Sequence, residues 1–184
     1  MDTLDSLVHL CPPPATNHAR PGIPSGAGAG GAQMTVPPLH ARLLEVYGPG
    51  SFNDFLWIFE QGCSNPWLDI DTLSRRAADI LSKKKIPEIR SIVADFKSDL
   101  SHLIQWGATD NADEIFWIPT GHPEDWPTLI VQAGQLEFQL IRRSSLEVLH
   151  GLIGGELRCP FFPEDFLRHR PTFERWTGDR REDD

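Results

Sequence analysis

Residues 122–124 have the types and spacing of a metal-dependent active site. His122-Pro123-Glu124 matches the H-x-E half of the zinc deaminase motif, in which the histidine binds the metal and the glutamate transfers protons. The other half of that motif, Pro-Cys-x-x-Cys, is missing, because Cys159-Pro160 has the reverse order and no second cysteine follows it. A turn that exposes two polar side chains therefore explains residues 122–124 better than a metal site.

Cysteine and histidine residues offer two further kinds of chemistry. Cys63 or Cys159 with a distant histidine would make a nucleophilic pair, but both fit better as small apolar packing residues. The seven histidines include no pair at the i, i+4 spacing of a helical zinc site, and His150 lies on the apolar stripe of its predicted helix. No phosphate-binding loop, dinucleotide fingerprint or nucleophile elbow occurs in context. We therefore expect no enzymatic activity, no metal and no cofactor.

Tryptophan side chains are the next candidates for a binding role, because they can stack on bases or sugars or take part in an interface. Trp106 and Trp117 lie in or beside apolar runs and are expected in the core. Trp67 and Trp126 each follow turn residues, so core and interface positions are equally open to them. The six tryptophans are Trp57, Trp67, Trp106, Trp117, Trp126 and Trp176.

The composition indicates a folded, acidic protein. Of 184 residues, 40% are hydrophobic, and 17 basic against 26 acidic residues give a net charge of −9. This balance disfavours a nucleic-acid partner, because phosphate contacts need clustered Lys and Arg. Three cysteines without a CxxC pair disfavour a disulfide framework. Neither a secretory signal nor a run of ~18 apolar residues occurs, so we expect a soluble cytoplasmic protein without membrane contact.

The ends of the chain differ in composition from its middle. Between Cys11 and Gln33, 15 of 23 residues are Pro, Gly or Ala. Such a segment cannot bury enough apolar surface to offset its ordering entropy, so residues 1–36 are predicted to be disordered and the first 33 dispensable. Met34 is an alternative start of the mature protein. The domain is predicted to span residues 37–177, with a frayed charged tail at 178–184.

Helical spacing of apolar residues predicts four helices in the first half of this domain. The first begins at Pro37-Pro38 and ends before Gly48. A second helix is expected from Ser51, because its apolar residues recur at positions 52, 55, 56 and 59. Asp71 and Pro87 are expected to begin the third and fourth helices.

The second half of the domain has a different period. Four apolar or alternating runs, at residues 102–106, 114–118, 128–131 and 136–141, are separated by short turn sequences that leave no room for crossover helices. Ser144 and Glu147 then form a capping box that begins a helix ending at Gly154-Gly155, and a short helix is expected at 163–168. The predicted fold class is α+β, an antiparallel β-meander of four or more strands packed by N-terminal and C-terminal helices.

Four motifs in this order resemble the SUKH superfamily, which includes the yeast cell-wall assembly regulators and many bacterial immunity proteins. The resemblance covers about residues 38–176. It rests on the segments Tyr47-Gly48-Pro49-Gly50-Ser51-Phe52, residues 106–117 around Asp110-Asn111-Ala112-Asp113, residues 121–127, and Leu146 to Leu157 followed by Phe162-Pro163. Related sequences often carry glycine at the position of Ala112. Because alanine resists positive φ, we expect a type I turn here, or a left-handed Asn111.

The resemblance implies a non-enzymatic domain that binds another protein. For an immunity protein this partner would be a toxin domain, often a nuclease, whose basic face would be steered to an acidic surface. The turns of the meander supply Asp110, Asp113, Glu124 and Asp125 as candidate contacts, beside Trp67 and Trp126. The alternative is a solitary adaptor or regulatory module with a resident cellular partner. A toxin gene next to this one would favour immunity, and its absence would favour the adaptor.

Overall fold

The computed structural model describes the chain except for residues 1, 16–32, 84–85, 135–136, 168–169 and 179–184. The described residues form a seven-stranded antiparallel sheet with the spatial order β6-β5-β4-β3-β2-β1-β7. The last four strands of the meander, β3 to β6, neighbour one another as they do in sequence, which confirms the predicted meander and the α+β class. The strands are β1 (Gly50–Phe52), β2 (Leu56–Ile58), β3 (Ile104–Thr109), β4 (Glu114–Trp117), β5 (Thr128–Val131), β6 (Phe138–Ile141) and β7 (Phe173–Arg175).

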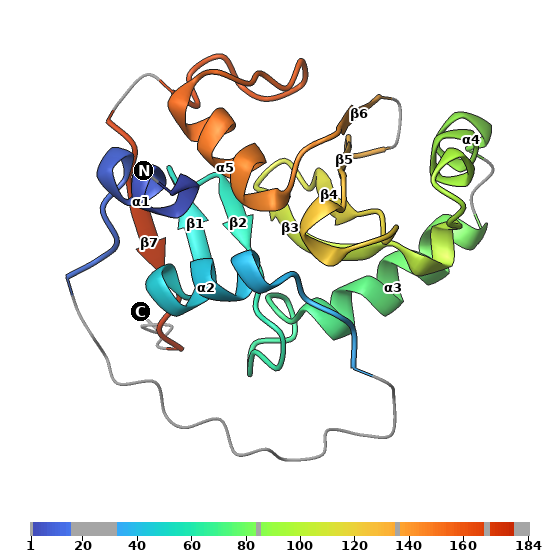
Figure 1. Cartoon of the computed structure of the whole chain (residues 1–184), viewed down its shortest axis with the longest axis horizontal. Coiled ribbons are helices and arrows are strands. Elements are labelled where there is room, and N and C mark those ends of the chain that lie inside the picture. The colour runs from blue at the N-terminus through green and yellow to red at the C-terminus, as the bar shows by residue number, and fades with distance from the viewer. Residues whose placement is uncertain (1, 16–32, 84–85, 135–136, 168–169, 179–184) are drawn as a thin grey trace, which may run out of the picture.

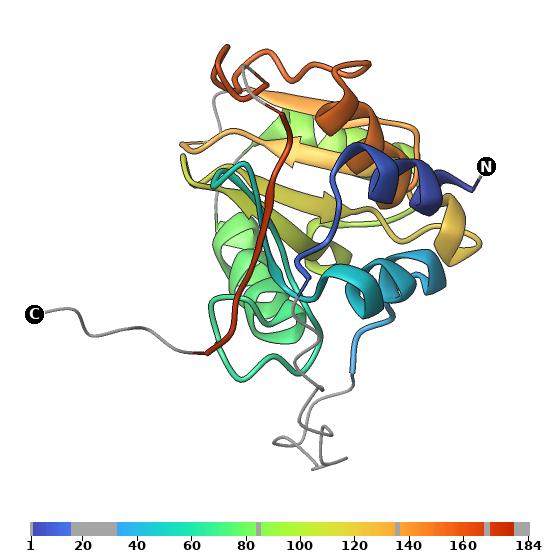
Figure 2. The same cartoon turned by 90° about the vertical axis from the view of Figure 1, so that its left-hand side faces the viewer.

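Helices cover both faces of this sheet (Figure 1). In Figure 2, α3 lies on one side of the strands while α1, α2 and α5 lie on the other. Two single turns of 3-10 helix, η1 (Leu100–His102) and η2 (Pro123–Asp125), lie in the connections. The α-helices of the described residues are α1 (Thr3–Leu10), α2 (Pro38–Tyr47), α3 (Ile70–Lys83), α4 (Pro87–Asp95) and α5 (Ser145–Gly154).

The sheet separates two hydrophobic clusters among the described residues. Trp106, Ile115 and Trp117 belong to the cluster that α1, α2 and α5 cover, whereas Phe116 and Ile118 belong to the cluster under α3 and α4. Successive residues of β4 therefore point into opposite clusters, as expected for an interior strand that is buried on both faces. Trp117 has no exposed surface, which confirms its predicted place in the core.

The N-terminal residues contradict the prediction that positions 1–36 are disordered. Residues 3–10 form α1, which packs against α5 and buries Leu4 and Leu7. The Tyr47 hydroxyl donates a 2.5 Å hydrogen bond to the carbonyl of the buried Cys11. The predicted dispensability of the first 33 residues is therefore withdrawn. Residues 16–32, the Gly- and Ala-rich part of the segment, lie outside the described residues.

The predicted helix from Ser51 is also wrong, because residues 50–58 form the β1–β2 hairpin. The hairpin loop is residues 53–55, and the Phe55 N–H donates to the Phe52 carbonyl at 3.1 Å. Asn53 and Asp54, the central residues of this turn, both have φ of 52°. The Asn53 side chain fixes this turn by accepting from the Thr172 N–H at 2.9 Å and donating to the Phe166 carbonyl at 2.8 Å. The apolar residues at 52, 55, 56 and 59 fit one face of a helix, but they are distributed over two short strands and their loop.

Side chains from distant elements hold both ends of α2. Pro37, the residue before the helix, provides no side-chain cap, and the Leu39 N–H donates instead to Glu124 of η2 at 2.8 Å. At the C-terminus the Arg175 guanidinium of β7 donates to the carbonyls of Val46 and Tyr47. A cation on the last carbonyls and an anion at the first N–H groups both complement the helix dipole.

The remaining predicted elements are mostly confirmed. Helices α3 and α4 begin within one residue of their predicted starts, and α5 has the Ser144–Glu147 capping box and a left-handed Gly155 at its end. The expected helix at 163–168 is wrong: residues 164–167 form a turn, and residue 168 lies outside the described residues. Of the predicted tail, residues 179–184 also lie outside them. No helix in the described part of the chain is long and apolar enough to span a bilayer.

Candidate protein-binding site

Asp113 is a structural residue rather than the exposed contact predicted from its turn. It is only 2% exposed, and its carboxylate accepts from the Thr109 hydroxyl at 2.7 Å and from the Ala133 N–H at 2.9 Å. These bonds join the β3–β4 turn to the loop that follows β5. A partner protein cannot reach this carboxylate, so Asp113 is removed from the candidate contacts.

The turn that precedes Asp113 departs from the expected geometry. Ala112 itself has φ of 64°, against the expectation that alanine avoids positive φ, and Asn111 is not left-handed. Its N–H donates to the Thr109 carbonyl at 2.9 Å, and the Thr109 N–H donates to the Asp113 carbonyl at 3.0 Å. The Thr109–Asp113 hydrogen bonds therefore hold an alanine in a region that L residues with a Cβ rarely adopt.

The Glu124 side chain also binds within the fold instead of facing a partner. Its Oε1 accepts from the N–H of Leu39, its Oε2 is buried, and its own N–H donates to His122 Nδ1 at 3.4 Å. The H-x-E sequence is thus a single 3-10 turn that braces α2, and its neighbour Asp125 is exposed. Among the described residues no group of three His, Cys, Asp or Glu side chains could hold a metal ion.

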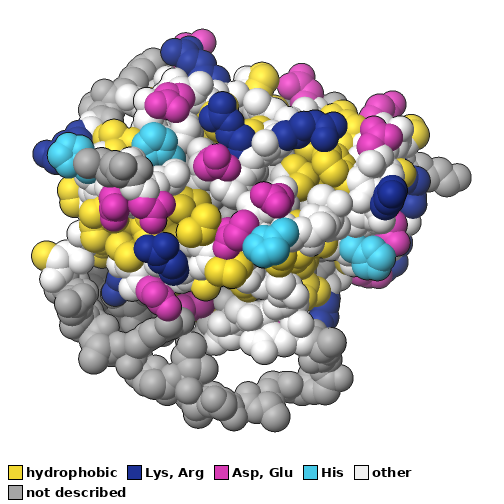
Figure 3. Space-filling view, viewed as in Figure 1, with side chains coloured by type: hydrophobic (Ala, Val, Ile, Leu, Met, Phe, Trp, Pro, Cys, Tyr) yellow, Lys and Arg dark blue, Asp and Glu magenta, His cyan; other side chains and the backbone are white. Residues whose placement is uncertain are grey.

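The two exposed acids of the meander do not share a patch. Asp110 lies in the β3–β4 turn, where its Oδ1 accepts from Trp57 Nε1 at 2.8 Å. Asp125 lies in the β4–β5 connection, which leaves the sheet at the opposite end of β4. On the face seen in Figure 3, acidic side chains are interspersed with basic and hydrophobic ones rather than gathered together. The candidate acids of the meander turns therefore do not form one patch.

Trp126 occupies the core rather than an interface, with 6% of its surface exposed. Its ring centroid lies 6.3 Å from that of Trp117 in an edge-on arrangement, and the Trp106 ring stacks on Trp117 with a centroid distance of 5.9 Å. The Nε1 atoms of these three indoles are buried without a hydrogen-bond partner among the described residues. These three tryptophans come from β3, from β4 and from the residue that follows η2.

His40 of α2 is the most unusual residue of this cluster and was not anticipated from the sequence. It is fully buried, packs edge-on against Trp106 and Trp117, and has Nδ1 3.1 Å from the Ser145 hydroxyl of α5. Burial lowers the pKa of His40 to about 3. The sequence indicates its position only indirectly: the spacing of Leu39, Leu43 and Leu44 places His40 on the apolar face of a helix.

The cysteines have the properties of packing residues. Burial raises the pKa of the Cys159 thiol to about 12 and that of Cys11 to about 11, and it also raises the pKa of Cys63. Because the thiolate is the nucleophile, these shifts oppose nucleophilic chemistry at neutral pH.

Trp67 is the large hydrophobic side chain that the described surface exposes, with 62% of its area accessible. It lies in the loop between β2 and α3, where the Arg76 guanidinium of α3 sits 4.8 Å from the ring centroid. The Trp67 N–H donates to Asn65 Oδ1 at 3.0 Å, and Asp69 accepts from the N–H groups of Gly62 and Thr72. Hydrogen bonds from its own side chains therefore hold the loop in place, and the Trp67 indole is exposed on this ordered loop.

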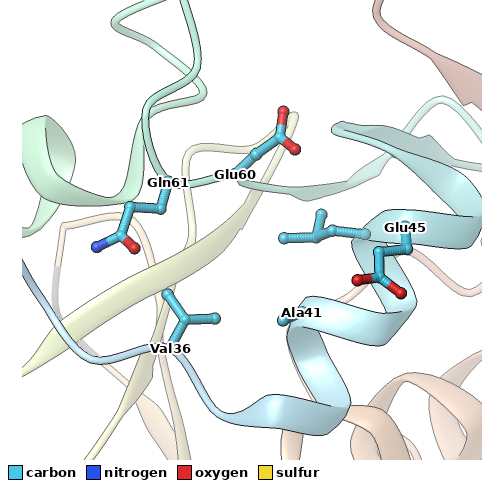
Figure 4. A pocket seen from close by; sticks show the side chains of 6 residues that line it. Val36, Ala41, Glu45, Glu60 and Gln61 are labelled. Carbon is cyan, nitrogen blue, oxygen red and sulfur yellow. The ribbon is translucent and has the colours of Figure 1, made fainter. Parts of the chain in front are cut away.

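A pocket of about 190 Å³ lies beside this loop, between α2 and the chain segment that precedes it (Figure 4). Apolar side chains from α2 and the preceding segment, and polar side chains from α2 and from the loop between β2 and α3, form its wall. The lining residues are Val36, Ala41, Leu44, Glu45, Glu60 and Gln61. Glu60 and Gln61 belong to the same β2–α3 loop as Trp67, and of these three residues only Trp67 was a candidate from the sequence.

Comparison of the chain with protein-family models, with curated proteins and with solved structures found no match.

Proposed function

We propose that this chain is a non-enzymatic protein-binding domain, and that it acts as an immunity protein that neutralises a toxin domain. The proposal rests on the SUKH resemblance and on the net charge of −9, which suits a basic partner such as a nuclease.

The motifs that carry the resemblance hold the fold together. Tyr47 and Phe52 are buried at the α2–β1 junction, Glu124 braces α2, and Leu146 and Leu149 lie in the core face of α5. Residues of this kind preserve a scaffold while its surface changes, so the contacts that select a partner must come from elsewhere.

The observation that carries the binding proposal is the exposed Trp67 under Arg76. Tryptophan and arginine are the residue types most enriched among the side chains that dominate interface energetics. Burying a side chain that is 62% exposed would also remove apolar area from water. The loop between β2 and α3, with α3 beside it, is therefore the proposed contact surface, and it replaces the meander turns.

The test is co-expression with the product of the neighbouring gene in a bacterial host. We expect that product to arrest growth alone and the wild-type chain to restore growth. Trp67→Ala should weaken binding of the purified partner at least ~30-fold, the effect of losing about 2 kcal/mol at an interface hot spot. Glu88→Ala on α4, an exposed residue far along the chain from this loop, is the matched control and should bind as wild type.

Two results would count against the proposal. A neighbouring product that is harmless, or that stays toxic when the chain is co-expressed, would contradict the immunity function. Unchanged affinity of Trp67→Ala for a confirmed partner would exclude this loop as the contact surface. A harmless neighbour together with a resident partner that binds through Trp67 would favour the adaptor module instead.

A further inference from the structure

Strand β6 is an open edge of the sheet. It stands at one end of the strand order, with β7 at the other, and within the described part of the chain no strand pairs with its outer side (Figure 1). The Gln132 N–H donates to the Glu137 carbonyl at 2.9 Å, so the backbone groups of Glu137 face β5. Because these directions alternate along an antiparallel strand, the N–H and C=O groups of Phe138 and Leu140 face outward.

The same edge leaves apolar surface partly open. Phe138 and Leu140 lie on the sheet face that α3 and α4 cover, at the border of that hydrophobic cluster, and both are only half-buried. On the other face Ile141 is buried, and Gln139 Nε2 donates to the Arg158 carbonyl at 3.1 Å. The outward backbone groups and the partly exposed apolar side chains thus belong to the same two residues. An added strand would bond the backbone groups and remove the apolar area from water.

The charged residues at the two ends of β6 complement each other. Glu137 precedes the strand, Arg142 and Arg143 follow it, and all three are exposed. A two-fold axis through Leu140 would pair each residue with the one equally far from Leu140 in a second copy. Glu137 then faces Arg143 of the second copy, and Phe138 faces its Arg142. Opposite charges, and an arginine against an aromatic ring, are both favourable cross-strand pairs.

We propose that the chain forms a two-fold dimer in which β6 pairs antiparallel with β6 of a second copy, centred on Leu140. A two-fold centre at Gln139 would also use the outward backbone groups, but it sets the Glu137 carboxylate against the buried Ile141 without a cation. The charges therefore select the centre at Leu140. Trp67 follows β2, four places from β6 in the strand order, so the dimer contact and the proposed partner surface belong to different parts of the molecule.

This dimer is expected to be weak. One short strand from each copy makes a small interface of the transient class. Each copy also carries a net charge of −9, so the two copies repel each other at long range. At a salt concentration of about 0.15 M the Debye length is about 8 Å, which screens this repulsion more than the charge pairs in contact. Association should therefore appear at high protein concentration and physiological ionic strength.

Sedimentation equilibrium of the full chain measures this association. We expect the mean mass to rise from 20.7 kDa toward twice that value between about 10 μM and 1 mM protein. Glu137→Arg and Arg143→Glu should each weaken association at least ~10-fold, because the two-fold axis makes two cross-strand pairs repulsive at once. Glu45→Arg makes the same charge change on the exposed side of α2 and is the control, which should associate no more weakly than the wild type.

Mixing the two single variants separates a wrong interface from a damaged chain. In the mixed dimer each introduced residue faces an opposite charge, so the equimolar mixture should associate about as strongly as the wild type. Both variants change exposed side chains and should keep the wild-type circular dichroism. Amide hydrogen exchange reports the register: the Leu140 amide should exchange more slowly as protein concentration rises, whereas the Gln139 amide, which already faces β5, should not change.

Several outcomes would overturn the proposal. A wild-type chain that stays monomeric up to about 1 mM would exclude the dimer. Association of Glu137→Arg equal to that of the wild type, or a mixture of folded single variants that stays monomeric, would exclude the pairing of Glu137 with Arg143. A dimer whose Leu140 amide exchanges as fast as in the monomer would place the interface away from β6. None of these results bears on toxin neutralisation, which the growth test measures separately.

Discussion

The carboxylate of Glu124 accepts a 2.8 Å hydrogen bond from the backbone N–H of Leu39, 85 positions earlier in the chain. This contact joins the β4–β5 connection to the first turn of α2, the helix that also carries His40 and one wall of the pocket. Glu124 lies in a turn sequence typical of an exposed catalytic or binding acid. It nevertheless provides the side-chain cap that Pro37 cannot provide for α2.

Replacing this cap should cost stability and leave binding intact. Glu124→Ala should lower the free energy of unfolding by about 1–2 kcal/mol, the usual effect of losing a helix cap. Urea titration measures it. The adjacent exposed Asp125→Ala is the control and should change stability by less than ~0.5 kcal/mol. Equal effects of the two substitutions would show that the Glu124–Leu39 contact contributes nothing.

The N-terminal helix should be required for full stability. Leu7 of α1 has no exposed surface, so Leu7→Ala should lower the free energy of unfolding by about 2–5 kcal/mol, the range for emptying a buried leucine site. The exposed His9→Ala on the same helix should change it by no more than ~0.5 kcal/mol. If both variants melt with the wild type, α1 does not belong to the core.

Stability should depend on pH through His40. Its pKa is lowered from 6.5 to about 3 in the folded chain, so between these values the unfolded chain binds a proton that the folded chain does not. The free energy of unfolding is then constant with respect to this group above pH 6.5 and falls as the pH drops toward 3. The slope should reach about 1.4 kcal/mol per pH unit.

Urea midpoints at several pH values between 4 and 8 test this, because carboxylates contribute the same background to every variant. His40→Gln should lose the slope that His40 contributes, whereas the exposed His9→Gln should keep it. Parallel pH profiles for wild type and His40→Gln would mean that the folded chain accepts the proton at His40.

Ala112→Gly should stabilise the protein. A residue with a Cβ pays about 1–2 kcal/mol at a φ of 64°, while the added freedom of glycine in the unfolded chain costs about 0.4–1 kcal/mol. We therefore expect the free energy of unfolding to rise by roughly 0.5–1 kcal/mol. Ala133→Gly, at a neighbouring exposed position with ordinary φ, should instead be neutral or destabilising. A loss of stability in Ala112→Gly would contradict the strain argument.

The sequence predicts those elements whose apolar periodicity, capping residues or turn residues lie within one continuous segment of sufficient length. The meander, α2, α3, α4 and α5 have clear periods, capping residues or turn sequences. Strands β1, β2 and β7 have three residues each, too few for an alternation to be recognised, and the apolar positions of the hairpin fit a helix. Helix α1 has only eight residues and lies next to the Pro- and Gly-rich segment, so its few apolar positions do not stand out from a stretch that is disordered by composition.

The site was less predictable than the fold, because exposure depends on contacts between distant residues. Asp113 and Glu124 have typical turn sequences, yet each is bonded to a backbone N–H elsewhere, at Ala133 and Leu39. Trp67 and Trp126 have similar local contexts, but only Trp67 lacks a covering element. The pocket needs three segments to meet, and no single motif contains them.

The position of β7 has a consequence for synthesis of the chain. Gly50 of β1 pairs with Arg175 of β7, and Arg175 also bonds the last carbonyls of α2. At 5–20 residues per second, a ribosome needs about 6–25 s to advance from one strand to the other. During that interval the nascent domain has a bare β1 edge and an uncapped α2, which are open to pairing with other chains. Chaperone demand should therefore be greatest just before residue 175 leaves the exit tunnel.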